Sequence, residues 1–265
     1  MHRLSKALFV LIILILTQTI SRGQTLGFQL DDGAQKVDIP FEIYNNLIVI
    51  PVVINDMLPL RFVLDTGVRT SILTEKAFAK LIGLTFNKEY TLGGLGEGRT
   101  IKAYISNGVT LKLPGVSGRG HAMLVLEEDY LELRNYLGAE VNGVLGYELF
   151  SRFIVKIDYD RKILTLYTPE KFKRRKSWIK IPMSVEDTKP YINGKAIYYN
   201  GKSVDMKLLV DTGASHGLIM YADSTENISV PENHIKTAVG RGLAGRLEGK
   251  LARLQAFQMG KACWE

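Results

Sequence analysis

The sequence predicts a fold dominated by β-strands and built from two copies of one structural unit. The tripeptide Asp-Thr-Gly occurs at residues 65–67 and again at residues 211–213, each time directly after three apolar residues. Two runs of strand-forming residues, separated by a turn pair, precede each tripeptide, and a glycine-rich stretch follows at the same sequence distance. Because the order of these features repeats, we predict two lobes related by a pseudo-two-fold axis.

The composition is that of a globular protein. Of the 265 residues, 46% are hydrophobic and 23% are charged, which excludes a disordered chain and a bundle of membrane helices. Much of the net charge of +7 lies in Lys171–Lys176. We interpret residues 171–178 as a solvated linker between lobes at 24–170 and 179–265, rather than a nucleic-acid or lipid site, because no aromatic platform accompanies the charges. Cys263 is the only cysteine, so stability must come from the core.

The N-terminus has the pattern of an export signal. A positively charged start is followed by the apolar run Ala7–Leu16 and by small residues before Gln24. The apolar run is shorter than the roughly 20 residues that span a bilayer as a helix. We therefore predict that residues 1–23 are a signal peptide and that the protein is periplasmic or extracellular. It would be membrane-anchored only if this segment stayed uncleaved.

Local patterns predict the elements of the first copy in chain order. The runs Ile50–Ile54 and Met57–Leu64 flank an Asn-Asp turn pair and predict a hairpin. Thr74 is the expected N-cap of a helix that reaches Leu81 and is ended by Gly83. The later predicted elements are a helix at 129–137, an apolar-glycine element at 143–146, a helical turn at 147–152 and strands at 153–158 and 163–167.

The second copy repeats only part of this order. Lys195–Tyr199 and Lys202–Val210 flank an Asn-Gly pair, a strong hairpin signal because both residues accept positive φ. The glycine-rich stretch at 237–245 corresponds to the one at 91–98, and both are expected to be hairpin tips that close over a ligand. No counterpart of residues 143–146 follows. We therefore expect the second lobe to be incomplete.

Asp65 and Asp211 are the candidates for chemistry, because a carboxylate at the end of a buried strand is costly unless it is compensated. If the lobes face each other, the two carboxyl groups are neighbours and share one proton. The ionised group can then accept a proton from water while the protonated one donates to a substrate carbonyl. The residues expected to bond across the interface, or to let the backbone turn tightly beside the acids, are Thr66, Gly67, Thr212 and Gly213.

These residues resemble a known family. Paired loops of three apolar residues and Asp-Thr-Gly, a glycine-rich stretch and the sequence Gly-Val-Leu-Gly at 143–146 are similar to the aspartic peptidases of pepsin and retropepsin type. Bacterial exported members that carry both lobes in one chain are the most similar group. The resemblance covers residues 40–168 well and residues 190–260 in part.

The resemblance implies a fold, an activity and site residues. The fold would be an all-β, acid-protease-like, bilobal barrel with pseudo-two-fold symmetry and a few short helices. The activity would be that of an aspartic-type endopeptidase, with Asp65 and Asp211 as the catalytic pair and the 143–146 element packed beneath the first loop. The substrate would be an extended peptide or protein, with no cofactor, metal or nucleic acid, and with the oligomeric state left open. The expected substrate-binding flap contains Gly93, Gly94, Gly96 and Gly98.

The chain departs from the family pattern at three places. Val68 and Arg69 follow the first Asp-Thr-Gly, where the family usually has Ala or Ser and then a small polar residue or Asp. Arg69 could place a cation near the acid pair and favour its ionised form. The flap lacks an evident tyrosine at its tip, and the second lobe is incomplete.

The sequence also contains motifs that are typical of other functions, and one alternative function competes with the peptidase. Residues 213–217 spell G-x-S-x-G, the pattern of a serine hydrolase, but the βα context is missing. Residues 240–245 spell G-x-G-x-x-G, without the acid that a dinucleotide site needs about 20 residues later. The four histidines have no metal-ligand spacing. The main alternative to the enzyme is a catalytically inactive, protease-like module that binds peptides or dimerises.

Overall fold

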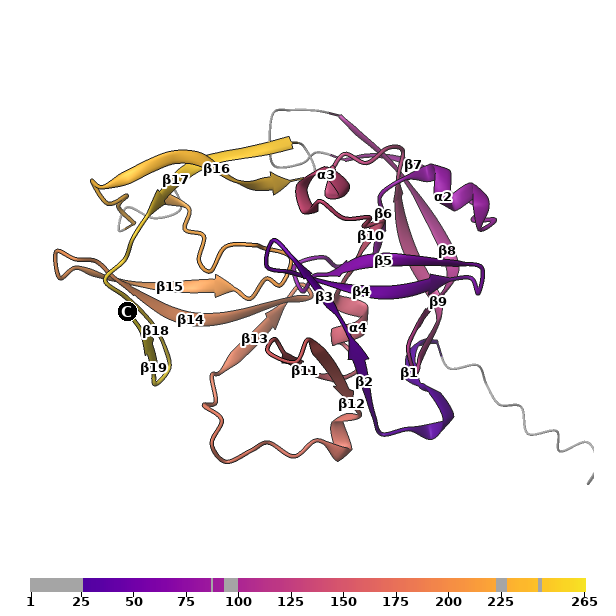
Figure 1. Ribbon diagram of the computed structural model, residues 1–265, viewed down its shortest axis with the longest axis horizontal. Coiled ribbons are helices and arrows are strands. Elements are labelled where there is room, and N and C mark those ends of the chain that lie inside the picture. The colour runs from indigo at the N-terminus through magenta and orange to yellow at the C-terminus, as the bar shows by residue number, and fades with distance from the viewer. Residues whose placement is uncertain (1–25, 87, 93–99, 223–227, 243–244) are drawn as a thin grey trace, which may run out of the picture.

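The computed structural model describes residues 26–86, 88–92, 100–222, 228–242 and 245–265. These residues form two lobes composed mostly of strands, with the first lobe at the right of Figure 1 and the second at the left in orange and yellow. The all-β architecture and the few short helices are as the sequence predicts. Among the described residues, no helix is long and apolar enough to cross a membrane.

The first lobe is built around a nine-stranded sheet among the described residues. Its neighbours run β1-β9-β6-β10-β5-β4-β8-β7, and β3 pairs with β4. The strands are β1 (Gly27–Leu30), β3 (Glu42–Tyr44), β4 (Leu47–Ile54), β5 (Leu58–Leu64), β6 (Ile72–Leu73), β7 (Lys88–Leu92), β8 (Ile101–Leu113), β9 (Val116–Leu126) and β10 (Gly143–Leu145).

A three-stranded sheet completes the first lobe in the order β11-β12-β2. Its strands are β11 (Ile154–Asp158), β12 (Ile163–Tyr167) and β2 (Lys36–Pro40). The helices of this lobe are α2 (Lys76–Leu81), α3 (Leu133–Leu137) and α4 (Tyr147–Phe150), with short 3₁₀ turns η1 (Asp31–Gly33) and η2 (Pro169–Lys171).

The second lobe contains a five-stranded sheet and a separate hairpin among the described residues. In the sheet, β14 pairs with β13, β15 and β18, and β18 pairs with β19. Strands β16 and β17 form the hairpin. The bounds are β13 (Met183–Glu186), β14 (Lys189–Ile197), β15 (Ser203–Leu209), β16 (His234–Gly242), β17 (Gly245–Ala252), β18 (Ala256–Met259) and β19 (Ala262–Trp264).

The two lobes repeat one local order. Strands β4 and β5 form the hairpin that ends at Asp65, and β14 and β15 form the hairpin that ends at Asp211. Strand β8 pairs with β4 as β18 pairs with β14. These pairings follow from runs of β-branched and large apolar residues that are bounded by Asn-rich turns.

The packed core belongs to the first lobe. Strand β4, with the sequence Leu-Ile-Val-Ile-Pro-Val-Val-Ile, is buried on both faces along most of its length. Both clusters of buried hydrophobic side chains among the described residues lie at or before Leu166. In the second lobe, strand β15 alternates between exposed and half-buried positions. The first lobe therefore provides most of the hydrophobic stabilisation.

Two local predictions are corrected by the structure. Thr74 is not the N-cap of α2: the cap is Glu75, and the Thr74 hydroxyl donates instead to the carbonyl of Asn142 at 2.9 Å. The helix expected at 129–137 begins only at Leu133, because Glu132 has φ of 47° and interrupts a helical start. In both cases a contact or backbone turn outside the local pattern determines where the helix begins.

Candidate active site

Two loops meet where β5 and β15 end. Asp65 follows β5 directly, and its backbone N–H donates to the carbonyl of Leu145 in β10 at 2.9 Å. Asp211 lies two residues after the end of β15. The N–H of Val210, the residue before Asp211, donates to the Pro190 carbonyl of β14 at 2.9 Å. Strand pairing therefore fixes the approach of the chain to both acids.

The two threonines join the loops by reciprocal hydrogen bonds. The N–H of Thr66 donates to Oγ1 of Thr212 at 3.1 Å, and the N–H of Thr212 donates to Oγ1 of Thr66 at 3.0 Å. Each hydroxyl also donates across the interface, from Thr66 to the Val210 carbonyl at 2.6 Å and from Thr212 to the Leu64 carbonyl at 2.8 Å. This arrangement brings together the loop residues that the sequence predicts to bond across the lobes.

The two carboxyl groups face each other across this junction. Gly67 N–H donates to Oδ1 of Asp65 at 2.6 Å, and Gly213 N–H donates to Oδ1 of Asp211 at 2.8 Å. Both carboxyl groups converge on Gly67, where an added Cβ would lie 3.1 Å from Oδ1 of Asp65 and 3.4 Å from Oδ1 of Asp211. A Cβ on Gly213 would collide with the carboxylate of Asp65, so only glycine permits this approach. The structure therefore brings Asp65 and Asp211 into one site.

The surroundings of the pair favour retention of a proton. Burial and the neighbouring charge of Asp211 raise the pKa of Asp65 from its ordinary value of 3.8 to about 7. Two backbone N–H donors, from Gly67 and Val68, act in the opposite direction but are outweighed. Asp65 is half-buried, whereas Asp211 is exposed. Because the groups interact strongly, the proton belongs to the pair, and burial favours Asp65 as its holder.

The first loop is supported from behind by its own lobe. Strand β10 lies parallel to β5, with Leu145 opposite Leu64, and antiparallel to β6. The N–H of Tyr147 donates to the Val68 carbonyl at 2.8 Å. A Cβ on Gly146 would collide with this carbonyl. The prediction that residues 143–146 pack beneath the first loop is confirmed.

A buried polar cluster also supports the first acid loop. The hydroxyl of Ser71 donates to Oε2 of Glu148 at 3.3 Å, and Nδ1 of His121 lies 3.2 Å from the same oxygen. His121 and Ser71 are both buried. The cluster joins β9, α4 and the chain between the first loop and β6, so it fixes the position of that loop rather than reaching the acids.

The second loop is held by groups of the first lobe that the sequence analysis missed. The side-chain amide of Asn46 donates to the Ser215 carbonyl at 3.0 Å, and the hydroxyl of Tyr136 is hydrogen-bonded to the Ser215 hydroxyl at 2.7 Å. The Asn45-Asn46 pair, between two strand-forming runs, was an available hairpin signal for one of these contacts. Nothing local in the sequence indicates the role of Tyr136.

Arg69 has a different partner from the one that the sequence suggests. Its guanidinium pairs with the carboxylate of Asp187 in the second lobe at 3.1 Å. Both side chains are largely exposed, so the pair contributes little free energy. The main causes that shift the pKa of Asp65 are burial, Asp211 and the backbone donors of Gly67 and Val68.

The predicted flap residues Gly93, Gly94, Gly96 and Gly98 lie outside the described residues, as do residues 1–23. The strands that flank the flap are paired, with Leu92 of β7 opposite Ile101 of β8. The glycine-rich stretch of the second copy joins β16 and β17, so its flanks also form a hairpin.

The competing motifs lack the structural context that their chemistry requires. Ser215 lies in a bend, and no α-helix follows it among the described residues up to 222. Its hydroxyl is 3.4 Å from Nδ1 of the adjacent His216 and is already bonded to Tyr136. Residues 240–245 belong to a β-hairpin rather than to a turn between strand and helix. Within the described residues, no group of three or more His, Cys, Asp or Glu side chains is arranged to hold a metal ion.

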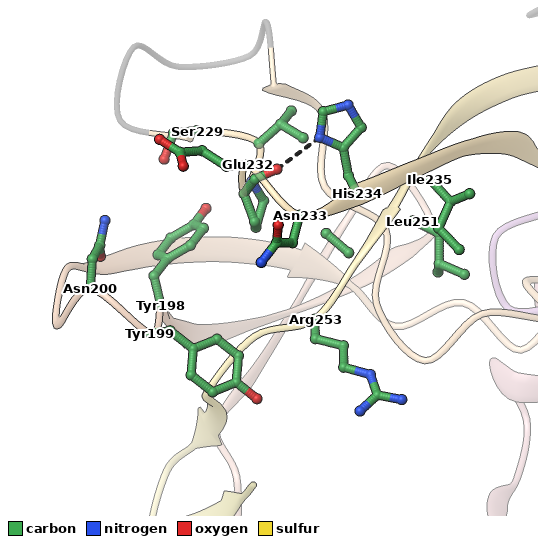
Figure 2. A pocket seen from close by; sticks show the side chains of 13 residues that line it. Tyr198, Tyr199, Asn200, Ser229, Glu232, Asn233, His234, Ile235, Leu251 and Arg253 are labelled. Atoms are coloured by element: carbon green, nitrogen blue, oxygen red, sulfur yellow. Dashed lines mark hydrogen bonds between the residues drawn. The ribbon is translucent and has the colours of Figure 1, made fainter.

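A surface pocket in the second lobe is separate from the acid pair. It is an open hollow of about 1210 Å³ in the second lobe, between the β14–β15 turn and the start of β16. Figure 2 shows Tyr198, Glu232 and His234 around it, and His234 Nδ1 donates to the Pro231 carbonyl at 2.8 Å. No residue of either Asp-Thr-Gly loop lines it. We therefore place the candidate active site at the carboxyl pair, whose chemistry the pocket does not share.

Comparison with known proteins gives a family for the first lobe. Residues 50–149 match a family model described as Aspartyl protease, and this span contains the first Asp loop and residues 143–146. Among solved structures, the chain is similar to a retropepsin-like aspartic protease from Rickettsia conorii, with 19% identity and a TM-score of 0.35 over 54% of this chain and 96% of that one. No protein with a curated description matches. The match over residues 50–149 supports the resemblance to aspartic peptidases and, with it, a protease function and a peptide substrate.

Proposed function

We propose that the protein is an aspartic-type endopeptidase that hydrolyses peptide bonds with a water molecule activated by Asp65 and Asp211. The observation that carries the proposal is the convergence of these two carboxyl groups, from loops of different lobes, on one site, in which burial and Asp211 raise the pKa of Asp65 to about 7. A pair that holds one proton at neutral pH supplies an acid and a base together.

The proposed reaction proceeds in two steps without a covalent enzyme intermediate. The ionised carboxylate accepts a proton from water as the water oxygen bonds to the scissile carbonyl carbon, and the protonated carboxyl donates its proton to the carbonyl oxygen. The resulting tetrahedral diol then breaks its C–N bond. One hydroxyl proton returns to the pair and the leaving nitrogen receives a proton, which gives a carboxylic acid and an amine. The pair ends with the single proton that it held at the start.

The substrate is an extended peptide. A peptide that crosses the site can pair its backbone with neighbouring strands, which gives binding with little dependence on side chains. We assign the glycine-rich stretch with Gly93, Gly94, Gly96 and Gly98 to this contact on its sequence, because backbone N–H and C=O groups of glycines are open to such pairing.

The test is cleavage of a mixed peptide library by the wild type, Asp65→Asn and Asp211→Asn. Both variants are expected to lose cleavage by at least a factor of about 10³, because neither a lone acid nor a lone base completes the reaction. Asp205→Asn is the matched control, since Asp205 is an exposed acid of β15 that pairs with Lys195. Cleavage that survives in either active-site variant would reject the proposal.

A second candidate is a protease-like module that binds peptides or dimerises without cleaving them. It is favoured by the concentration of buried hydrophobic side chains in the first lobe and by the exposure of Asp211. Peptide binding by the wild type, measured by calorimetry, together with no cleavage between pH 3 and 8, would favour this module over the enzyme.

We also propose that the protein is exported, on the sequence pattern of residues 1–23. Cell fractionation and N-terminal sequencing of the mature protein test this. A mature N-terminus at Gln24 is expected, whereas a full-length protein in the cytosolic fraction would reject export.

A further inference from the structure

The fourth residue after each catalytic candidate contacts a tight turn of the opposite lobe. Arg69 pairs with Asp187, and the Ser215 carbonyl accepts from Asn46. The two turns are equivalent, since Tyr44 pairs with Leu47 across the first turn and Glu186 pairs with Lys189 across the second. The central residues of both turns have positive φ, at 46° and 65° in the first and 45° and 70° in the second. Such two-residue turns match the twist of a hairpin and hold their side chains in a defined direction.

The two contacts differ in strength. The Arg69–Asp187 pair is exposed and contributes little. At Ser215, by contrast, two groups of the first lobe bind one residue: the Asn46 amide at the carbonyl and the Tyr136 hydroxyl at the side chain. Asn45 binds the Tyr136 carbonyl at 2.5 Å and so joins the turn to α3. We call this set of four residues the interlobe clasp: Asn45, Asn46, Tyr136 and Ser215.

The clasp is anchored in the rigid part of the molecule. The ring of Tyr136 packs against the buried cluster that contains Leu133 and Val144. Short helix α3 lies between Glu132 and Gly138, which both have positive φ, so its length and direction are fixed by its ends. The Tyr136 hydroxyl is therefore presented to Ser215 from a packed position rather than from a loop.

The two acid loops are supported in different ways. The first loop is held at its start by Leu145 and at its end by Tyr147, both from its own lobe. In the second lobe, β15 pairs only with β14 among the described residues, and no strand there takes the place of β10. The threonine bonds hold the start of the second loop, and the clasp holds Ser215 at its end.

We propose that Tyr136 and Asn46 are positioning residues for Asp211: they fix the end of its loop from the first lobe, where no strand of the second lobe does so among the described residues. The inference rests on the proposed function, which it deepens. With both ends of the loop fixed, the Asp211 carboxyl keeps its orientation towards Asp65. Displacement of a reacting group by about 1 Å is enough to cost two orders of magnitude in rate.

Two variants test the inference with little disturbance elsewhere. Tyr136→Phe removes only the hydroxyl, and Asn46→Gly removes the amide while it tolerates the positive φ. Tyr44→Phe is the control for the first, because the Tyr44 ring packs against the same cluster and its hydroxyl donates to Glu42. Thr188→Gly is the control for the second, because it occupies the equivalent turn position.

The expected result is a kcat lower by roughly 10- to 100-fold in Tyr136→Phe, with KM changed by less than a factor of about two, and an additional loss in the double variant. Amide hydrogen exchange should become faster at residues 211–217 and stay unchanged at residues 65–68. Both control variants should match the wild type.

Three other results would overturn either the clasp, its positioning role or the proposed function. Unchanged exchange at 211–217 in both variants would overturn the clasp, and faster exchange with unchanged kcat would overturn its role in positioning. A wild type that cleaves no peptide would reject the proposed function, whereas the exchange measurement would still support or overturn the clasp. Failure and success of the two proposals are therefore distinguishable.

Discussion

Thr66 and Thr212 each donate a backbone N–H to the hydroxyl oxygen of the other, at 3.1 and 3.0 Å, although they are 146 residues apart in the chain. Each hydroxyl in turn donates to a carbonyl of the opposite lobe. The pair therefore forms a closed set of four hydrogen bonds with a pseudo-two-fold axis at its centre. The same axis places the two carboxyl groups opposite each other.

Thr212→Val is expected to lower both activity and stability, while Thr212→Ser should preserve them. Valine keeps the shape but leaves the N–H of buried Thr66 and the Leu64 carbonyl without their partner. An unsatisfied buried group costs about 1–3 kcal/mol. Urea unfolding and peptide cleavage measure the two effects. If Thr212→Val and Thr212→Ser had the same stability and the same cleavage rate, the reciprocal hydrogen bonds would not hold the lobes together.

The stability of the protein should decrease as the pH rises from about 4 to about 7. Because the pKa of Asp65 is raised from 3.8 to about 7, the folded state keeps a proton that the unfolded chain has released in this range. The stabilisation is complete below pH 3.8 and is lost as the pH reaches the folded value, with a slope of at most about 1.4 kcal/mol per pH unit. Urea unfolding at several pH values measures this slope.

Two of the variants made for the cleavage assay also serve as controls for the dependence of stability on pH. Asp65→Asn should remove the slope, whereas the exposed Asp205→Asn should retain it. Cleavage by the wild type should also fall above pH 7, because the pair then loses the proton that it donates. An identical slope in Asp65→Asn and wild type would contradict the perturbed site.

Gly213→Ala should abolish most of the activity without unfolding the protein. The new Cβ would collide with the Asp65 carboxylate and push the two acids apart. We expect a loss of roughly 100-fold or more in kcat/KM, since geometry at the reacting atoms is most sensitive to displacement. Gly217→Ala is the matched control in the same loop, because a Cβ there has nothing within 4 Å. Equal activity in the two variants would be inconsistent with the close approach.

Gly146→Ala should lower the free energy of unfolding and the activity together. Its Cβ would collide with the Val68 carbonyl, which is backbone and cannot rotate away, so the bond from Tyr147 must lengthen. Overpacking of this kind costs about 1–3 kcal/mol. Chemical denaturation and cleavage assays should show both losses. Unchanged activity at reduced stability would mean that the first loop does not depend on this support.

Local sequence patterns predicted most of the strands and turns of this molecule. The predictions that were wrong concern residues whose partners are distant in the sequence. The hairpins around Asn55 and Asn200 follow from strand-forming runs and turn residues, which are short-range signals. The internal repeat then predicted that the two acid loops meet. The cap at Thr74 was wrong because Asn142, which is distant in sequence, provides a better partner for its hydroxyl.

The residues that hold the second loop could not be found in the same way. The internal repeat predicts that both acid loops are supported by the same kind of element. It therefore predicts a second copy of residues 143–146 beneath the second loop. The structure instead uses Asn46 and Tyr136 of the other lobe, and the bond from Tyr136 breaks the symmetry. A pattern based on internal similarity does not detect the Tyr136 contact, because Arg69, the residue equivalent to Ser215, is described only with Asp187 as its partner.

The uneven distribution of the hydrophobic core has a consequence for the order of assembly. The first lobe contains both buried clusters and is synthesised first, so it can form its sheet before the second lobe is available. The second loop then docks onto threonine, tyrosine and asparagine groups that are already in place. The two acids would meet only at this last step, so under the proposed mechanism a nascent or half-folded chain would contain no water-activating pair and would not attack its own unfolded segments.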